Sequence, residues 1–100
     1  MMRVEILHID DCANWEEAGR RVTIALAATG HADASVTFRT LRTPADAARF
    51  AFAGSPTITV DGVDLFPSAE RISDLACRLY VTPAGLAGVP TVEQLEDALA

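Results

Sequence analysis

Residues 54–66 read G-S-P-T-I-T-V-D-G-V-D-L-F and contain the most specific local geometry in the chain. Thr57 to Val60 and Val63 to Phe66 are predicted to form two short strands. The Asp61-Gly62 pair between them is a two-residue loop whose tolerance of positive φ matches the twist of a tight antiparallel hairpin. The stretch therefore predicts a β-hairpin.

A proline stands immediately before this hairpin, in the Ser55-Pro56 pair. Proline has no N–H to donate, so it is tolerated at the first position of a strand. The bond that precedes a proline can also adopt the cis form. The spacing alone leaves the isomer of Ser55-Pro56 open.

Length and composition limit the rest of the fold. The chain has 100 residues, of which 50% are hydrophobic, and this is enough for one domain with a single core, covering residues 1–100. The net charge of −6 argues against nucleic acid or an anionic membrane surface as a partner, because both require clustered cations. The sequence has no apolar stretch near the roughly 20 residues that span a bilayer, and no secretory signal pattern. We expect a cytoplasmic protein.

The first half of the chain alternates strands and helices. Val4–Ile9 is a nearly continuous apolar run, typical of a central strand covered on both faces. A helical pattern follows and ends at Gly30, with its N-cap at Asn14, which has Glu17 in capping-box spacing, or at Cys12. In either case Cys12 lies at or just before a helix N-terminus.

A second strand and a second helix precede the hairpin. Residues 34–41 alternate in polarity and predict a strand. A helix start is predicted at Thr43, which is followed in the favoured order by a first-turn proline, Pro44, and an acid, Asp46. The predicted helix runs through Phe52 and is closed by Gly54.

The region 67–90 is predicted as an irregular insert. Helical spacing favours a short helix from Ser68 to Leu79 followed by a loop, with an extended Cys77–Val81 as the alternative. Thr91 and Gln94 then form a capping box that begins a terminal helix. The element order is strand, helix, strand, helix, strand, strand, helix, and the first strand–helix–strand unit requires a right-handed parallel crossover.

Four short motifs now point to a known family: D-C-A-N-W at 11–15, G-S-P-T-I at 54–58, C-R-L-Y at 77–80 and G-V-P-x-x-E-x-L at 88–95. The match to this family covers nearly the whole chain. The sequence resembles the thioredoxin-like proteins, and more narrowly small bacterial members labelled as thioredoxin family or associated with alkylmercury lyase. The resemblance implies a thioredoxin-like α/β fold, β-α-β-α-β-β-α, with a four-stranded mixed sheet flanked by helices.

The resemblance also implies a site. Cys12 takes the place of the attacking thiol of thioredoxins, and Pro56 the place of their cis-proline, which faces that thiol. The resolving cysteine of a C-x-x-C pair would stand at position 15, where this chain has Trp15, and Ala13 replaces the proline of the narrower group. The expected activity is that of a thiol–disulfide oxidoreductase without a C-x-x-C pair, acting on a protein or small-molecule thiol and using no cofactor.

The residues around Cys12 act in opposite directions on its reactivity. A helix N-terminus favours the thiolate, which is the attacking form. Asp10, Asp11, Glu16 and Glu17 oppose it, because negative charge near a forming thiolate raises its pKa. A reactive thiol and an inert, partly buried cysteine both remain open.

Cys77 is the candidate partner for Cys12, because both cysteines lie in shared motifs. A disulfide needs Cα atoms about 4.4–6.8 Å apart, which the sequence cannot show. The alternative is a small apolar core residue on a helix face with Leu75 and Leu79. A further alternative is soft-metal or mercurial binding at Cys12 beside Asp10 and Asn14, although a closed site needs about three or four ligands and only one sulfur is local.

A binding role needs no thiol. Trp15 and Tyr80 are expected to line a groove beside the segment Ser55, Pro56 and Thr57, in which an extended peptide is held; core packing of the two aromatic residues is the alternative. A homodimer could form along Val63–Phe66, whose Asp64 would discourage uncontrolled pairing. The two histidines are expected in structural roles, His8 as a hydrogen-bonded core residue and His31 as a solvated turn residue.

Overall fold

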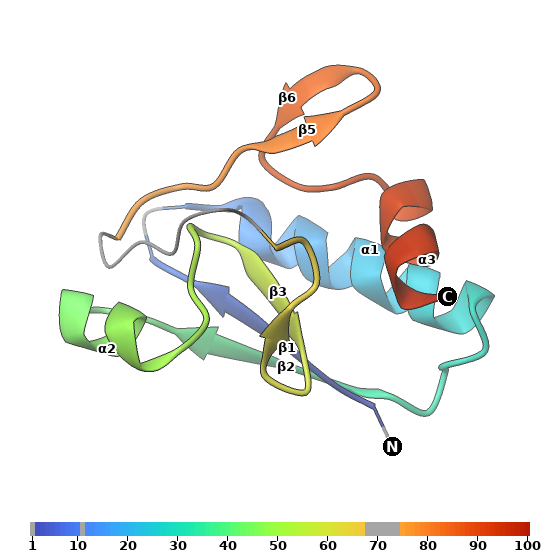
Figure 1. Cartoon of the computed structure of the whole chain (residues 1–100), viewed down its shortest axis with the longest axis horizontal. Coiled ribbons are helices and arrows are strands. Elements are labelled where there is room, and N and C mark those ends of the chain that lie inside the picture. Colours follow the sequence, from blue (N-terminus) through green and yellow to red (C-terminus); the bar gives the residue numbers. More distant parts are fainter. Residues whose placement is uncertain (1, 11, 68–74) are drawn as a thin grey trace.

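A four-stranded mixed sheet with strand order β2-β1-β3-β4 forms the centre of the fold (Figure 1). The computed structural model describes residues 2–10, 12–67 and 75–100. Strand β1 pairs in parallel with β2, while β3 runs antiparallel to both β1 and β4. The elements are β1 Arg3–His8, α1 Asn14–Ala28, β2 Ser35–Thr40, α2 Pro44–Arg49, β3 Thr57–Val60, β4 Val63–Asp64, β5 Tyr80–Thr82, β6 Gly85–Ala87 and α3 Val92–Leu99.

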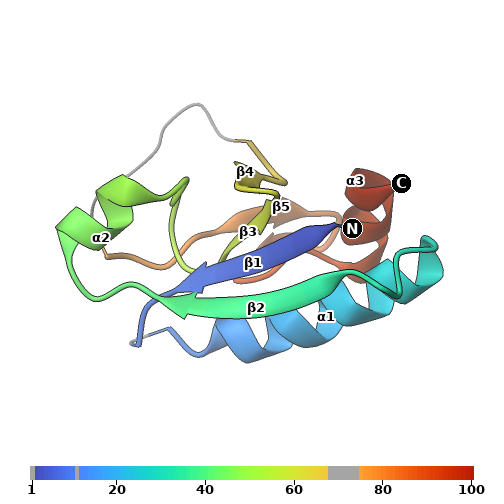
Figure 2. The ribbon, with the colours of Figure 1, turned by 90° about the horizontal axis from the view of Figure 1, so that it is seen from below.

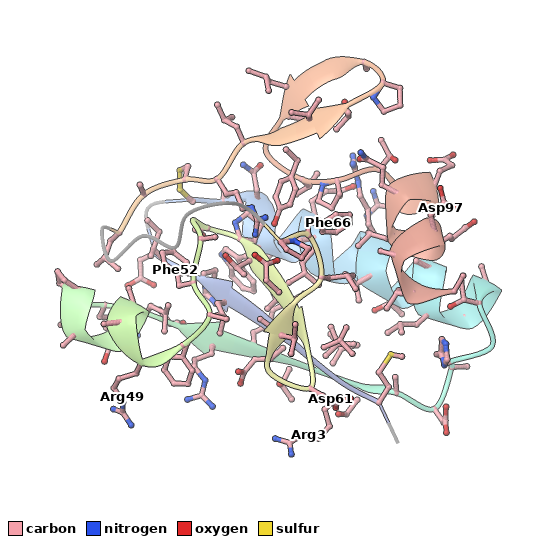
Figure 3. The ribbon with its side chains drawn as sticks, viewed as in Figure 1. Arg3, Arg49, Phe52, Asp61, Phe66 and Asp97 are labelled. Carbon is pink, nitrogen blue, oxygen red and sulfur yellow. A yellow bond between two sulfur atoms is a disulfide. The ribbon has the colours of Figure 1, made fainter. Side chains whose placement is uncertain are left out.

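Helices cover the two faces of this sheet unequally (Figure 2). Helices α1 and α3 pack on one face, where Val4, Ile6 and Ile58 join the larger core cluster. Helix α2 covers one end of the other face, over a smaller cluster that includes Leu7 and the fully buried Phe52 (Figure 3). The central strand is therefore buried from both sides toward its C-terminal end, where the chain leaves for Cys12.

The hairpin prediction is confirmed. Strand β3 has the predicted bounds, and the loop residues Asp61 and Gly62 have φ angles of 51° and 86°. Strand β4 is shorter than predicted because regular pairing ends at Asp64. The Ser55-Pro56 bond is cis, as the resemblance implies.

The remaining predicted elements of the main sheet and its helices are present with small differences at their ends. The Thr91–Gln94 capping box is confirmed, and Thr43 caps α2 by accepting the N–H of Asp46. The N-cap of α1 is Ala13, which makes no side-chain bond; neither of the two predicted caps is used. The predicted extension of α2 through Phe52 is wrong, because the backbone is already extended at Phe50.

The prediction for the region 67–90 needs the largest correction. Its first part, residues 68–74, lies outside the described residues. Residues 75–79 are not helical: Cys77 forms an isolated parallel bridge with Ser55. The predicted loop at 80–87 is instead a second hairpin, β5–β6, in which Gly85, the first residue of β6, has a positive φ.

Candidate functional site

Cys12 and Cys77, the two cysteines of the chain, form a disulfide bond, drawn in yellow in Figure 3. Their Cα atoms are 6.1 Å apart, within the range that disulfides require. The bond joins residues 65 positions apart in the sequence. The pairing hypothesis is confirmed, and the alternative of Cys77 as a buried residue on a helix face is wrong.

Cys12 is the buried half of this bond. Its side chain is 3% exposed and belongs to the smaller core cluster with Leu7, Ile9 and Leu41. It stands two residues before the first residue of α1, so that the expected position near a helix N-terminus is confirmed. The side of Cys12 that faces the protein is therefore closed by aliphatic side chains.

Two of the acidic residues near Cys12 have cationic partners. Glu17 accepts hydrogen bonds from Arg20 and Arg21, which lower the pKa of its carboxyl. A carboxylate oxygen of Asp10 lies 3.7 Å from Nε of Arg42. The negative charge around Cys12 is thus partly offset.

Backbone hydrogen bonds hold the segment that carries Cys77. The N–H of Ser55 donates to the carbonyl of Ala76, and the N–H of Arg78 donates to the carbonyl of Ser55, both at 2.8 Å. This is the pairing of a short parallel strand, with Cys77 beside Ser55. Cys77 is consequently fixed against the loop that begins the main hairpin, independently of the disulfide.

Arg78 ties the same segment to the end of β4. Its Nη1 donates to both carboxylate oxygens of Asp64, at 3.0 and 3.2 Å, and its Nη2 donates to the carbonyl of Phe66. The guanidinium also lies 4.6 Å from the centre of the Tyr80 ring, in a cation–π contact. Both charged side chains are largely buried, at 8% exposed for Arg78 and 14% for Asp64.

Tyr80 closes the segment onto the Ser55-Pro56 bond. Its hydroxyl donates to the carbonyl of Pro56, and its ring meets Phe66 edge to face. Burial raises the pKa of this hydroxyl far above its usual value, so Tyr80 is a neutral donor. Tyr80 and Pro56 are brought together as expected, but in a buried contact.

The neighbouring residues Ser55 and Thr57 are buried and serve the loop itself. The hydroxyl of Ser55 accepts the N–H of Ile9 at 3.0 Å. The hydroxyl of Thr57 donates to the carbonyl of Gly54 and accepts the N–H of Ala53. Their side chains therefore hold the end of β1 and the loop in place, beside Cys77.

Trp15 makes aromatic contacts on the sheet. It stacks on His8 with ring centres 4.4 Å apart and meets Phe38 of β2 edge to face. Its ring is partly buried and packs against the larger core cluster, as the alternative of core packing expects. Tyr80 contacts Phe66 and the Pro56 carbonyl, and a groove lined by Trp15 and Tyr80 stays a prediction.

The histidines have structural surroundings. His8 is buried, and its Nε2 lies 3.3 Å from the hydroxyl of Thr40, in agreement with the prediction. His31 differs from the prediction, because its Nε2 lies 3.2 Å from the carbonyl oxygen of Leu99 at the end of α3. The contacts of the His8 ring are with Trp15 and Thr40 and that of the His31 ring is with Leu99, so no base is assigned to the site.

A hollow of about 320 Å³ lies beside the smaller core cluster that contains Cys12, lined by Ile9, Asp10, Leu41, Arg42 and Leu75. Its lining is mixed, with three aliphatic side chains and the Asp10–Arg42 ion pair. Within residues 2–10, 12–67 and 75–100, no group of three or more His, Cys, Asp or Glu side chains could hold a metal ion. Soft-metal binding would therefore depend on the two sulfurs.

The sequence analysis missed the roles of Arg78, Asp64 and Gly54. A signal was present for Arg78, because C-R-L-Y-V alternates in polarity, as an extended strand would. Gly54 carries a φ of +111°, and a Cβ added there would lie 2.7 Å from Cβ of Arg78 and 2.9 Å from its Cα. The close approach of the Cys77 segment depends on this glycine.

We expect Gly54→Ala to loosen the Cys77 segment. A methyl group forced against Arg78 overpacks the site, which costs about 1–3 kcal/mol in unfolding free energy, in addition to the cost of a positive φ. The matched control is Gly62→Ala, since Gly62 also has a positive φ but open space around it. Urea unfolding of both variants measures the difference; equal destabilisation would contradict the close approach.

The comparisons with known proteins add no relative. No protein-family model, curated protein or solved structure matches the chain. Over the described ranges, none of the helices has the length and apolar character needed to cross a membrane. The functional argument therefore rests on the site.

Proposed function

We propose that the protein is a thioredoxin-like thiol–disulfide exchange protein whose redox pair is Cys12 and Cys77. The observation that carries the proposal is their disulfide, which links a cysteine beside the start of α1 to an exposed one. The element order and the strand order β2-β1-β3-β4 support the thioredoxin-like reading. Cys77 then takes the role that position 15 lacks.

A purely structural disulfide is the alternative that must be separated from this proposal. Structural disulfides resist reduction by the glutathione pool, whereas exposed ones are the labile, regulatory or catalytic ones. Cys77 is exposed, and its segment is held in place by other contacts. The two sulfurs therefore stay close when the bond is open, as reversible exchange requires.

Equilibration in glutathione buffers tests the proposal. We expect the oxidised and reduced forms to interconvert fully across buffers of reduced and oxidised glutathione, as measured by alkylation and mass spectrometry. The same protein should accelerate the reduction of a model protein disulfide such as that of insulin. Cys12→Ser and Cys77→Ser should abolish that acceleration, while Asp97→Ala, at an exposed position of α3, should keep it.

A disulfide that stays intact in every glutathione buffer, with no acceleration of insulin reduction, would leave only a structural role. The native fold of each variant should be verified by circular dichroism, so that lost activity is not confused with unfolding.

A non-catalytic binding module is the second candidate, favoured by one observation. Three large apolar residues on or next to the β5–β6 hairpin are exposed to 63–77% of their surface: Leu79, Val81 and Leu86. Val81 is paired with Leu86 across the hairpin. Exposed apolar rows of this kind mark interaction sites. If a double Cys12→Ser, Cys77→Ser variant binds the same partner as the wild type, the function is binding. If partner binding is lost in this variant, the function is thiol–disulfide exchange.

A further inference from the structure

The two sulfurs of the disulfide differ in access. Cys12 is 3% exposed and packs among Leu7, Ile9 and Leu41, whereas Cys77 lies in the exposed class. The resemblance assigns the first attack to Cys12. The burial of its side chain contradicts that assignment for any partner that arrives from solvent.

The local backbone explains why Cys77 faces outward. From Cys77 to Thr82 exposure alternates strictly, with 77, 79 and 81 outside and 78, 80 and 82 inside. Arg78 and Tyr80 fill the inward positions and bind Asp64 and the Pro56 carbonyl. The inward anchors thus leave Cys77 on the exposed side of its segment.

We propose that Cys77 is the sulfur that exchanges with the partner thiol, and that Cys12 is the leaving and resolving sulfur. The inference rests on the proposed function and reverses the order of the two cysteines expected from the resemblance. An attacking thiolate must reach a disulfide sulfur, so access decides which of the two is attacked. Cys77 is the exposed residue of the two and Cys12 the buried one.

The exchange balances as two steps. A partner thiolate attacks Sγ of Cys77, forms a mixed disulfide with it and breaks the Cys12–Cys77 bond, and the electron pair leaves on Sγ of Cys12, which takes a proton from water. A second partner thiolate then attacks the partner sulfur of the mixed disulfide and releases Cys77 as a thiolate. The protein gains two electrons and two partner thiols become one disulfide.

The reverse reaction uses the same roles. The Cys77 thiolate attacks an external disulfide, forms the mixed disulfide and releases one partner thiolate. The Cys12 thiolate then attacks Sγ of Cys77, re-forms the internal bond and releases the second partner thiolate. The start of α1 favours negative charge near Cys12 in both directions.

Contacts other than the disulfide keep Cys12 within reach of Cys77 during this cycle. The Ser55 backbone bonds, the Arg78–Asp64 pair and the Tyr80–Pro56 bond involve neither sulfur and do not depend on the sulfur bond. Holding two reacting groups close converts a bimolecular step into an intramolecular one. Resolution by Cys12 is therefore fast, and the mixed disulfide is short-lived unless Cys12 is removed.

Adduct mapping on the wild-type protein tests the proposal without a variant. Oxidised protein is mixed with reduced glutathione, quenched with acid within the first turnover, digested and analysed by mass spectrometry. We expect glutathione on Cys77. An adduct on Cys12, or equal adducts on both, would overturn the inference but leave the exchange function standing; a disulfide that is not reduced at any glutathione concentration would overturn both.

A matched pair of variants gives the second measurement. Cys12→Ser and Cys77→Ser both lose the disulfide, so their native folds are compared first by circular dichroism. We expect Cys12→Ser to react with oxidised glutathione about tenfold or more faster than Cys77→Ser, and to accumulate a stable mixed disulfide at Cys77. Equal rates, or faster reaction of Cys77→Ser, would contradict the assignment.

Discussion

Arg78→Met is expected to lower the free energy of unfolding by about 3 kcal/mol. Arg78 and Asp64 are 8% and 14% exposed, and removal of one partner leaves the other charge buried without compensation, which costs about 3–5 kcal/mol. The variant also loses the hydrogen bond to the Phe66 carbonyl and the contact with the Tyr80 ring, while methionine keeps part of the packing volume. Chemical denaturation of the oxidised protein measures the change.

A double-mutant cycle identifies the cause of this loss. Asp64→Asn removes the charge but keeps an oxygen for the N–H of Phe66, which Asp64 accepts at 2.9 Å. The double variant Arg78→Met, Asp64→Asn should therefore be more stable than Arg78→Met alone, because no buried charge remains. Additive losses would mean that the two side chains are not coupled.

A second readout connects this ion pair to the site. Arg78 adjoins Cys77, and the ion pair holds the Cys77 segment against β4. Arg78→Met should slow closure of the disulfide after reduction, because Cys77 is held less firmly near Cys12. Asp97→Ala, at an exposed position of α3, should leave the rate of closure unchanged.

The sequence alone predicted those elements whose signals are local. The Asp61-Gly62 loop requires positive φ and brings its own strands together, and the Thr91–Gln94 box is complete within four residues. Strand β1 could be identified by its apolar run. These features do not depend on what the rest of the chain does.

The region after Pro67 could not be predicted in the same way, because its conformation depends on distant partners. A short apolar run with Leu75 and Leu79 fits helical spacing, and only the pairing of Cys77 with Ser55 makes this part extended. The inward-facing Arg78 looks like a surface cation until Asp64 is seen beside it. Tertiary contacts therefore determine the conformation of this region.

The sequence predicted which residues belong to the candidate site better than it predicted what each residue does there. Cys12, Cys77, Pro56 and Tyr80 meet in one place. The contrast in burial between the two sulfurs depends on the packing of Leu41 and its neighbours in the second cluster, which no local pattern contains. The spacing of Trp15 shows that it lies on α1, but its contacts with His8 and Phe38 depend on how α1 packs on the sheet.

Reduction of the Cys12–Cys77 bond is expected to lower the free energy of unfolding by about 4 kcal/mol. In the chain-entropy model, a crosslink lowers the conformational entropy of the unfolded chain. For cysteines 65 positions apart, this stabilises the folded protein by about 4 kcal/mol. The folded state should change little, because Ser55, Arg78 and Tyr80 hold the segment without the sulfur bond. The effect is therefore assigned mainly to the unfolded state.

Urea unfolding of the oxidised and reduced protein measures this loss, with the double variant Cys12→Ala, Cys77→Ala as the control that cannot re-form the bond. The reduced protein and the control should agree, and both should show a larger dependence of free energy on urea than the oxidised protein, because an unlinked chain exposes more surface on unfolding. If oxidised and reduced protein unfold at the same urea concentration, the bond does not restrict the unfolded chain. If far-ultraviolet circular dichroism also changes on reduction under native conditions, the Ser55 pairing and the Arg78 anchor are too weak to hold Cys77 in place, and rapid resolution by Cys12 would not follow.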